Sequence, residues 1–376
     1  MNNKIEGKIE LSESPDFEKT HQNLENLIQS LEMNEEEMNL LTGEIHDTFE
    51  DVHFELLPSF DEAGDLAIKT EAPMDQATHD DPLMLSFTLS EADSIDLNEL
   101  MEVAVPLIFR FDGEGDMWIV DHPEETLFRF NRINDHKVVH SFTIPKGSEK
   151  YCIGFPGNLI LDEEGCLFVL DLVQQTIHKF SGEGEYDNDF QDHLLAASPM
   201  ISVRDFDLFR EERLLVVSDF LRSSVKKISL EGMDMGEVIL REGPAPQAFE
   251  CATGVAALPG GRYFVVDPVK MAVLELDLEG HRIGGFFFND RSRREMPFCF
   301  LMEKSPDRHL FLVDFKSQSL HAYDTNGAIK GVFQVGPNSS TPELSLGFFD
   351  FMGQGKLYFL DPRSCRIHCL LYHFEA

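Results

Sequence analysis

An aspartate that closes an apolar segment recurs six times in this 376-residue sequence. It ends the tetrapeptides WIVD, FVLD, VVSD, FVVD, FLVD and YFLD, at Asp121, Asp171, Asp219, Asp267, Asp314 and Asp361. Carboxylates can act as acid–base groups or metal ligands, but a residue repeated once per structural unit is more typical of a turn, where it accepts backbone N–H bonds. We therefore predict a structural role for these six aspartates.

The other residues that could carry chemistry do not form a known catalytic motif. The sequence contains no GxSxG, HExxH, P-loop or CxxC pattern, so the common signals of acyl transfer, zinc binding and phosphate binding are missing. Cys365, His368 and Cys369 resemble a ligand set, but residues three apart on a strand point to opposite faces, which favours a packed core. We predict no catalytic residue, no metal and no cofactor, and we expect the six scattered cysteines to be reduced thiols.

The repeated aspartates divide the sequence into six units of similar length. Their successive spacings are 50, 48, 48, 47 and 47 residues. Each unit contains four candidate strands, and its central strand, such as CLFVLD, is apolar at consecutive positions. A strand that is apolar on both faces suits a sheet packed on both sides by other sheets, as in the blades of a propeller. The sequence therefore predicts an all-β, six-bladed β-propeller.

The unit GxLFVxDxxxxxIxxF resembles the NHL repeat, and the resemblance covers about residues 104–376. It implies an NHL-like six-bladed β-propeller. Some related propellers are metal-dependent hydrolases or lyases that bind the ion at the central channel, and some NHL propellers bind RNA on a basic face. The turn after the aspartate departs from the family's N-x-R pattern, because only Cys365-Arg366-Ile367 keeps an arginine there. This departure weakens the transfer of any one member's ligand.

The last unit lacks chain for a fourth strand, because it ends at Leu370-Leu371-Tyr372-His373-Phe374. An open final edge would favour aggregation. The segment Leu83–Leu89 resembles Val138–Ile144, the expected fourth strand of the first unit. We predict that residues 83–89 complete the last blade, so that the propeller domain spans residues 83–376.

The region before the propeller is strongly acidic. The whole chain has 31 Lys+Arg and 68 Asp+Glu, a net charge of −37, and residues 1–100 carry more than half of that charge. An apolar residue recurs there at every seventh position, which predicts a helical arm over residues 1–57, either a coiled coil or a helical hairpin. Residues 58–82 are an acidic linker with prolines. The predicted arm interface consists of Phe17, Leu24, Leu31, Met38, Ile45 and Val52.

Two sets of propeller residues are candidates for binding. A metal-dependent hydrolase or lyase would need inward-facing groups from several blades, and the candidates on inner strands are Asn158, Asp205, Asp207 and Asp350. Turns and connections on one face carry basic residues, and the turns of the opposite face are acidic. The predicted partner-binding set is Arg222, Lys270, Arg291, Arg293, Arg294, Lys316 and Arg363.

These observations favour a non-catalytic scaffold or adaptor that binds a protein partner, with the arm used for docking, oligomerisation or self-masking. A basic face would attract an acidic partner or the protein's own arm. A metal-dependent hydrolase or lyase is the alternative, and RNA binding is a further one that the net charge of −37 and the single Trp disfavour. No apolar run suggests a membrane span or export signal, so we expect a cytoplasmic protein.

Overall fold

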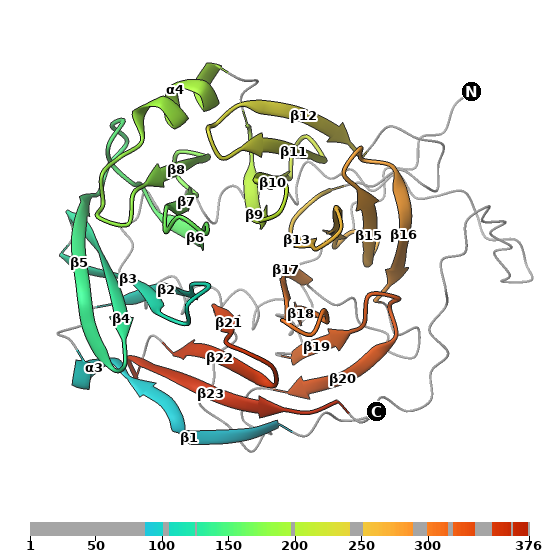
Figure 1. The fold of residues 1–376 in the computed structure, drawn as a ribbon. Coiled ribbons are helices and arrows are strands. Elements are labelled where there is room, and N and C mark those ends of the chain that lie inside the picture. The colour runs from blue at the N-terminus through green and yellow to red at the C-terminus, as the bar shows by residue number, and fades with distance from the viewer. Residues whose placement is uncertain are drawn as a thin grey trace, which may run out of the picture. The chain divides into compact units, whose positions relative to one another are not determined.

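The computed structural model describes residues 87–100, 105–124, 126–196, 200–240, 251–288, 299–314, 319–334, 348–361 and 364–374. Within these ranges the chain forms six antiparallel sheets around a central axis (Figure 1). The six-bladed β-propeller predicted from the repeats is confirmed. The predicted arm (residues 1–57), with its interface residues Phe17 to Val52, and the predicted linker (58–82) lie outside the described residues.

Four blades are built from consecutive four-stranded antiparallel sheets. The strands of blade 1 are β2 (Pro106–Phe111), β3 (Met117–Glu124), β4 (Leu127–Asn134) and β5 (Lys137–Pro145). Those of blade 3 are β9 (Val203–Phe209), β10 (Leu214–Asp219), β11 (Ser224–Ser229) and β12 (Asp234–Ile239). Those of blade 4 are β13 (Val255–Leu258), β14 (Arg262–Asp267), β15 (Ala272–Asp277) and β16 (Arg282–Phe287). Those of blade 5 are β17 (Cys299–Lys304), β18 (Leu310–Asp314), β19 (Ser319–Tyr323) and β20 (Ile329–Gln334).

Blade 6 combines the two ends of the propeller chain. Its inner strands are β21 (Phe349–Phe351), β22 (Lys356–Asp361) and β23 (Arg366–Tyr372), and its outer strand is β1 (Phe87–Asp96). Strand β1 runs antiparallel to β23, with Phe87 opposite Tyr372. The predicted closing segment, residues 83–89, overlaps β1 only at its last three positions, and residues 83–86 lie outside the described residues. The short helix α3 (Leu97–Leu100) follows β1.

Blade 2 departs from the expected four-stranded pattern. Its sheet contains β6 (Pro156–Leu161), β7 (Leu167–Asp171) and β8 (Thr176–Phe180), and helix α4 (Asn188–Ala196) follows where a fourth strand was expected. The Asp187 carboxylate accepts a hydrogen bond from the Phe190 N–H (2.9 Å), so an N-cap starts the helix. Among the residues that the structure describes, no helix combines the length and apolar composition that a membrane span requires.

The core consists of apolar layers between neighbouring blades. Every residue of β7 and β18 is buried, as expected for central strands that have a blade on each side. Between blades 3 and 4, the rings of Phe209 and Tyr263 meet edge to face, with centroids 6.0 Å apart. Cys369 is fully buried in the apolar layer between blades 6 and 1, which confirms the packed-core interpretation for this cysteine.

The repeated aspartates of blades 2, 3 and 4 accept N–H bonds from the turn that follows them, whereas Asp121 of blade 1 binds the side chains of Arg129 and Asn131. The Asp171 carboxylate accepts N–H bonds from Val173 (2.9 Å) and Gln174 (3.0 Å) in the turn after it. It also accepts bonds from Gly154 (2.6 Å) and Phe155 (3.2 Å) in the connection before the inner strand. The predicted structural role is confirmed at this position, where one carboxylate ties a turn to the entry of its own blade.

Candidate functional site

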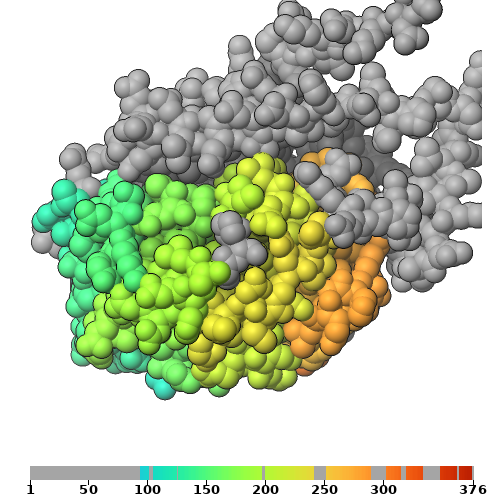
Figure 2. All heavy atoms as spheres, turned by 90° about the horizontal axis from the view of Figure 1, so that it is seen from above, coloured from blue at the N-terminus to red at the C-terminus, as the bar shows by residue number. Residues whose placement is uncertain are grey.

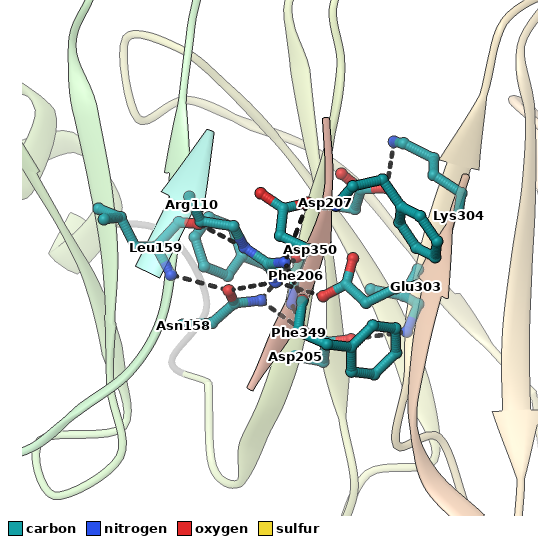
Figure 3. Close-up of polar contacts among 12 residues, drawn as sticks. Arg110, Asn158, Leu159, Asp205, Phe206, Asp207, Glu303, Lys304, Phe349 and Asp350 are labelled. Carbon is teal, nitrogen blue, oxygen red and sulfur yellow. Dashed lines mark hydrogen bonds and ion pairs between the residues drawn. The ribbon is translucent and has the colours of Figure 1, made fainter. Parts of the chain in front are cut away.

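Polar side chains from five inner strands converge at the centre of the ring (Figure 3). We call this set the channel cluster. It comprises Arg110 from β2, Asn158 from β6, Asp205 and Asp207 from β9, Glu303 and Lys304 from β17, and Asp350 from β21.

Strand register places these residues, apart from Lys304, in two adjacent layers. Arg110, Glu303 and Asp350 each pair with the residue three positions before the repeated aspartate of their blade. Asp207 occupies the same position in blade 3. Asn158 and Asp205 instead pair with the residue directly before the aspartate. The propeller repeat therefore brings equivalent positions of different blades to one level of the axis.

The guanidinium of Arg110 binds acceptors from blades 2 and 6. Its Nε donates to the Leu159 carbonyl (3.1 Å) and its Nη1 donates to the Phe349 carbonyl (3.1 Å). Its Nη2 donates to the Asn158 side-chain oxygen (2.9 Å). Arg110 thus joins blades 1, 2 and 6 through hydrogen bonds to their inner strands.

Two carboxylates complete the surroundings of this guanidinium. Arg110 Nη2 forms a hydrogen-bonded ion pair with Glu303, and Nη1 lies 3.6 Å from the Asp350 carboxylate. Asp350 also accepts N–H bonds from Phe111 and Phe351, both at 2.8 Å. Burial opposes the charge on Arg110, but Glu303 and Asp350 raise the pKa of Arg110 above its ordinary value. The guanidinium is therefore a permanent cation at the centre of the cluster.

Asp205 links blades 2, 3 and 4. One carboxylate oxygen accepts a hydrogen bond from the Asn158 amide (2.8 Å), and the other accepts one from the Val255 N–H (3.0 Å). Its own backbone N–H donates to the Ser218 hydroxyl (3.0 Å). Burial raises the pKa of Asp205 to about 7, although Val255, Arg110 and Asn158 all favour the charged form.

Asp207 links blades 3, 4 and 5. Its carboxylate accepts a hydrogen bond from the Ala257 N–H (2.7 Å) and forms a hydrogen-bonded ion pair with Lys304. The Leu208 N–H donates to its other oxygen (2.7 Å). Together with the contacts of Arg110 and Asp205, this arrangement connects all six blades through polar groups in the channel.

Glu303 is a second carboxyl group of the cluster with a raised pKa. Burial raises the pKa of Glu303 to about 8, and the nearby Arg110 only partly offsets this shift. Burial also raises the pKa of Asp350. The Glu303 side chain keeps 25% of its surface exposed, so it reaches the solvent of the channel. Glu303 and Asp205 can therefore gain or lose a proton near neutral pH.

The geometry of the cluster does not fit a resident divalent cation. Among the described residues, triplets of His, Cys, Asp or Glu donors within 4.8 Å of one another occur at two turns, Asp162–Cys166 and Asp277–His281. The channel carboxylates do not form such a triplet, and the Arg110 guanidinium lies among them. Divalent cations require several oxygen ligands at about 2.0–2.6 Å. The predicted candidates converge, and the Arg110 guanidinium lies between Asn158 and Asp350 of this set.

Sequence reasoning found part of this cluster. Asn158, Asp205, Asp207 and Asp350 were candidates, and the structure brings them together, whereas Arg110, Glu303 and Lys304 were missed. The sequence does contain a pattern that indicates the channel residues, because Arg110, Glu303 and Asp350 each stand 11 residues before a repeated aspartate. Reading that offset across the six units identifies three of the blades that place charge in the channel.

The predicted basic face lies largely outside the described residues. Arg222 Nε lies 3.1 Å from the Glu237 carboxylate, which balances its charge. The Lys270 N–H donates to Asp267 (3.1 Å) within a turn, and its side chain is half-buried. The other five residues lie outside the described ranges and are Arg291, Arg293, Arg294, Lys316 and Arg363.

The sequence matches no protein-family model and no curated protein. Its fold is similar to that of a streptogramin B lyase (TM-score 0.50, 12% identity, 76% of this chain, 98% of the other). It is also similar to selenomethionine-substituted virginiamycin B lyase from Staphylococcus aureus (0.51, 12%, 76% and 99%). A catalytically inactive variant of the S. aureus virginiamycin B lyase with quinupristin is similar too (0.51, 11%, 76% and 99%). These likenesses support the six-bladed propeller fold, and the NHL repeat remains a resemblance.

Proposed function

We propose that this protein is a non-catalytic scaffold whose rigid propeller binds a protein partner through its loops and outer rim. The observation that carries the proposal is the saturation of Arg110. Its guanidinium donates to two backbone carbonyls and to the side chains of Asn158 and Glu303. A channel whose polar groups bind one another stiffens the ring and leaves partner recognition to the outer surfaces.

The proposal includes an acidic protein partner and a binding role for the acidic arm, residues 1–57. The basic set predicted from the sequence would attract an acidic protein segment, or the chain's own acidic residues 1–57. The arm would then serve docking, oligomerisation or self-masking. Long-range attraction of this kind weakens as salt increases, because the Debye length falls to about 8 Å at physiological ionic strength.

Affinity capture from the lysate of the native organism tests this function. The full-length chain and residues 80–376 are used in parallel, at low and high salt, and captured proteins are identified by mass spectrometry. We expect at least one stoichiometric protein, and a difference between the two chains would show whether the arm recruits or masks. Capture of no protein by either chain would overturn the scaffold proposal.

Charge reversal localises the captured partner on the propeller. Replacing Arg291, Arg293 and Arg294 by Glu should weaken capture, most strongly at low salt. The matched control is Lys137→Glu, because Lys137 is an exposed lysine on β5. Equal capture by both variants at low salt would place the partner elsewhere on the molecule.

A proton-transferring lyase or hydrolase is the second candidate, favoured by the pKa values in the channel. A carboxyl group with a pKa near 7 or 8 can remove and return protons at neutral pH, and Asp205 and Glu303 have this property. In a screen of lyase and hydrolase substrates, this candidate requires turnover that Glu303→Gln abolishes. The control Glu185→Gln changes an exposed carboxylate and should keep full activity.

A further inference from the structure

The outer edge of blade 2 is built differently from the outer edges of the other blades. After β8 the chain starts a fourth strand with a single bridge between Phe180 and Tyr186. The Asp187 N–H then donates to the Lys179 carbonyl (2.9 Å), and the chain turns into α4. In blade 3 the equivalent segment continues as β12, which pairs with the full length of β11. Blade 2 therefore lacks a strand along the Thr176–His178 part of β8.

Helix α4 takes the place of the missing strand. Phe190 and Leu194 are its buried apolar anchors, and the Gln191 side chain donates to the Thr176 hydroxyl (3.3 Å). Its remaining residues are exposed apart from Gln191, so only these two apolar side chains hold the helix, through a cluster that includes Phe168 and Ile177. Elements with few buried apolar contacts open at low free energy relative to the core.

The helix also rests against the hairpin of blade 3 that joins β11 to β12. The His193 ring nitrogen Nδ1 lies 2.8 Å from the Glu231 carbonyl. A Cβ atom at Gly232 would lie 2.2 Å from the Phe190 carbonyl oxygen, so the helix touches the hairpin backbone. Figure 2 shows this rim, where the green atoms of the segment that contains α4 adjoin the yellow-green and yellow atoms of blade 3.

Buried polar atoms without a hydrogen bond occur in α4, in β8 and in the turn before β8. Gln191 Oε1 and Gln175 Oε1 are buried without a hydrogen bond. His178 is also buried, and its Nε2 makes no hydrogen bond, although the Asp171 carboxylate lies 3.4 Å away. Buried polar atoms without partners destabilise the arrangement that encloses them. The closed position of α4 is therefore less favourable than a fully paired fourth strand would be.

We propose that α4 is a displaceable cover, and that an extended segment of a protein partner binds β8 as the fourth strand of blade 2. The proposal rests on the proposed scaffold function and names how the partner is held. Strand addition supplies backbone hydrogen bonds along an exposed sheet edge, with alternate side chains providing specificity. The other five blades each have an antiparallel strand at this outer position, so the position suits a strand.

The neighbouring blades indicate the apolar position of such a segment. In blades 3 and 4, the third-strand residue six positions after the repeated aspartate faces an apolar residue of the fourth strand. These pairs are Val225 with Val238, and Val273 with Phe286. The equivalent residue of blade 2 is Ile177, which belongs to the apolar layer shared with blade 3. The partner therefore places an apolar side chain opposite Ile177.

The next position of the segment differs between blades. In blade 3, Glu237 lies opposite the buried Lys226. Lys226 is equivalent to His178 of blade 2, since each stands seven residues after the repeated aspartate. In blade 5 the equivalent residue is also a histidine, His321, and it lies opposite Val332, so either a polar or an apolar side chain fits opposite His178. Because α4 must leave first, the apparent affinity is lowered by the fraction of molecules that are closed.

Hydrogen exchange on the full-length chain tests whether α4 is displaceable. Phe190→Ala removes the larger apolar anchor, and we expect the backbone amides of Ile177 and His178 to exchange at least about tenfold faster than in the wild type. Leu195→Ala is the matched control, because the Leu195 side chain is 66% exposed on the same helix. Unchanged exchange at β8 in a folded Phe190→Ala protein would overturn the proposal. If that variant does not fold, His193→Ala loosens the helix without altering the core.

Strand addition is tested with a peptide copied from β12 and its flanks, residues 233–240 (MDMGEVIL). We expect it to bind the loosened variant at least about tenfold more tightly than the wild type, since opening no longer opposes binding. A control peptide has lysine in place of Glu237 and aspartate in place of Val238, and it should not bind. Equal binding of both peptides, or of one peptide to both proteins, would overturn the proposal.

These results separate the two proposals. Faster exchange and selective peptide binding, together with no protein captured from the lysate, would refute the scaffold function but keep the open edge. A captured protein that the peptide does not displace from the loosened variant would keep the scaffold function and overturn strand addition at blade 2.

Discussion

The ring is held together in different ways at its centre and at its outer seam. At the centre, charged side chains of the channel cluster join blades that are distant in sequence, with Arg110 bound to Glu303 and Asn158. At the seam, β1 and β23 form a backbone ladder, and apolar residues such as Leu97 and Ile367 pack beneath it. The inner closure therefore depends on protonation and charge balance, whereas the outer closure depends on backbone pairing and apolar burial.

Removing the seam should have the largest effect. A chain that begins at residue 97 lacks β1 and leaves the edge of β23 unpaired. We expect this chain to be insoluble or to lose its cooperative thermal unfolding, because an unpaired apolar edge promotes aggregation. Thermal unfolding followed by circular dichroism measures the effect, with a chain that begins at residue 80 as the control. Equal melting temperatures for the two chains would refute the role of β1 in closing the ring.

Breaking the centre should have the next largest effect. Arg110→Ala leaves Glu303 and Asp350 buried without their cation, and breaking a buried ion pair in this way costs about 3–5 kcal/mol of unfolding free energy. Urea denaturation at pH 9, above the pKa of about 8 of Glu303, measures this loss. The double variant Arg110→Met, Glu303→Gln removes both charges and should recover part of the stability. A single variant as stable as the wild type would show that the cluster does not support the ring.

The centre should also respond to pH. Because the folded protein holds Glu303 and Asp205 at raised pKa values of about 8 and 7, it binds more protons than the unfolded chain between about pH 4 and 8. Their contribution to stability is therefore fully present at low pH and is lost as pH rises. Each group contributes up to about 1.4 kcal/mol of destabilisation per pH unit in that window.

Urea denaturation between pH 5 and 8 measures this slope. Glu303→Gln should flatten it, because the amide does not titrate, while the exposed control Glu185→Gln should keep the wild-type slope. Identical slopes for the wild type and Glu303→Gln would contradict the raised pKa of Glu303.

The smallest effect is expected from a charge at the seam. Asp96 of β1 pairs with Arg366 of β23 at 2.9 Å, and both side chains remain partly exposed to solvent. Exposed ion pairs contribute little, since water and salt screen them. Asp96→Asn should therefore leave the melting temperature within experimental error of the wild type at 0.15 M salt. A decrease as large as that of Arg110→Ala would remove the distinction between the seam and the centre.

Local sequence patterns predicted the blades well, because each blade is specified by residues close together in the chain. The apolar run before Asp171 predicts a central strand, and β7 is buried along its whole length. The same logic predicted the turn role of Asp171. In blade 2 the repeat pattern predicted the first three strands but not the fourth element, because Asp187 caps a helix where a strand was expected. The pair Phe190 and Leu194, four residues apart, was a helical signal within a segment interpreted as strand.

The sequence alone determined the number of blades and the strand order within most of them, because six units spaced 47–50 residues apart each carry the same apolar and turn signals. Only the tertiary structure determined which charged side chains lie next to one another in the channel. Arg110 and Asp350 are 240 residues apart, and they become neighbours only when β1 joins β23 and the inner strands align in register. The raised pKa values follow from that closure, because the ring buries Asp205 and most of the Glu303 side chain, and the nearby Arg110 offsets this effect only in part.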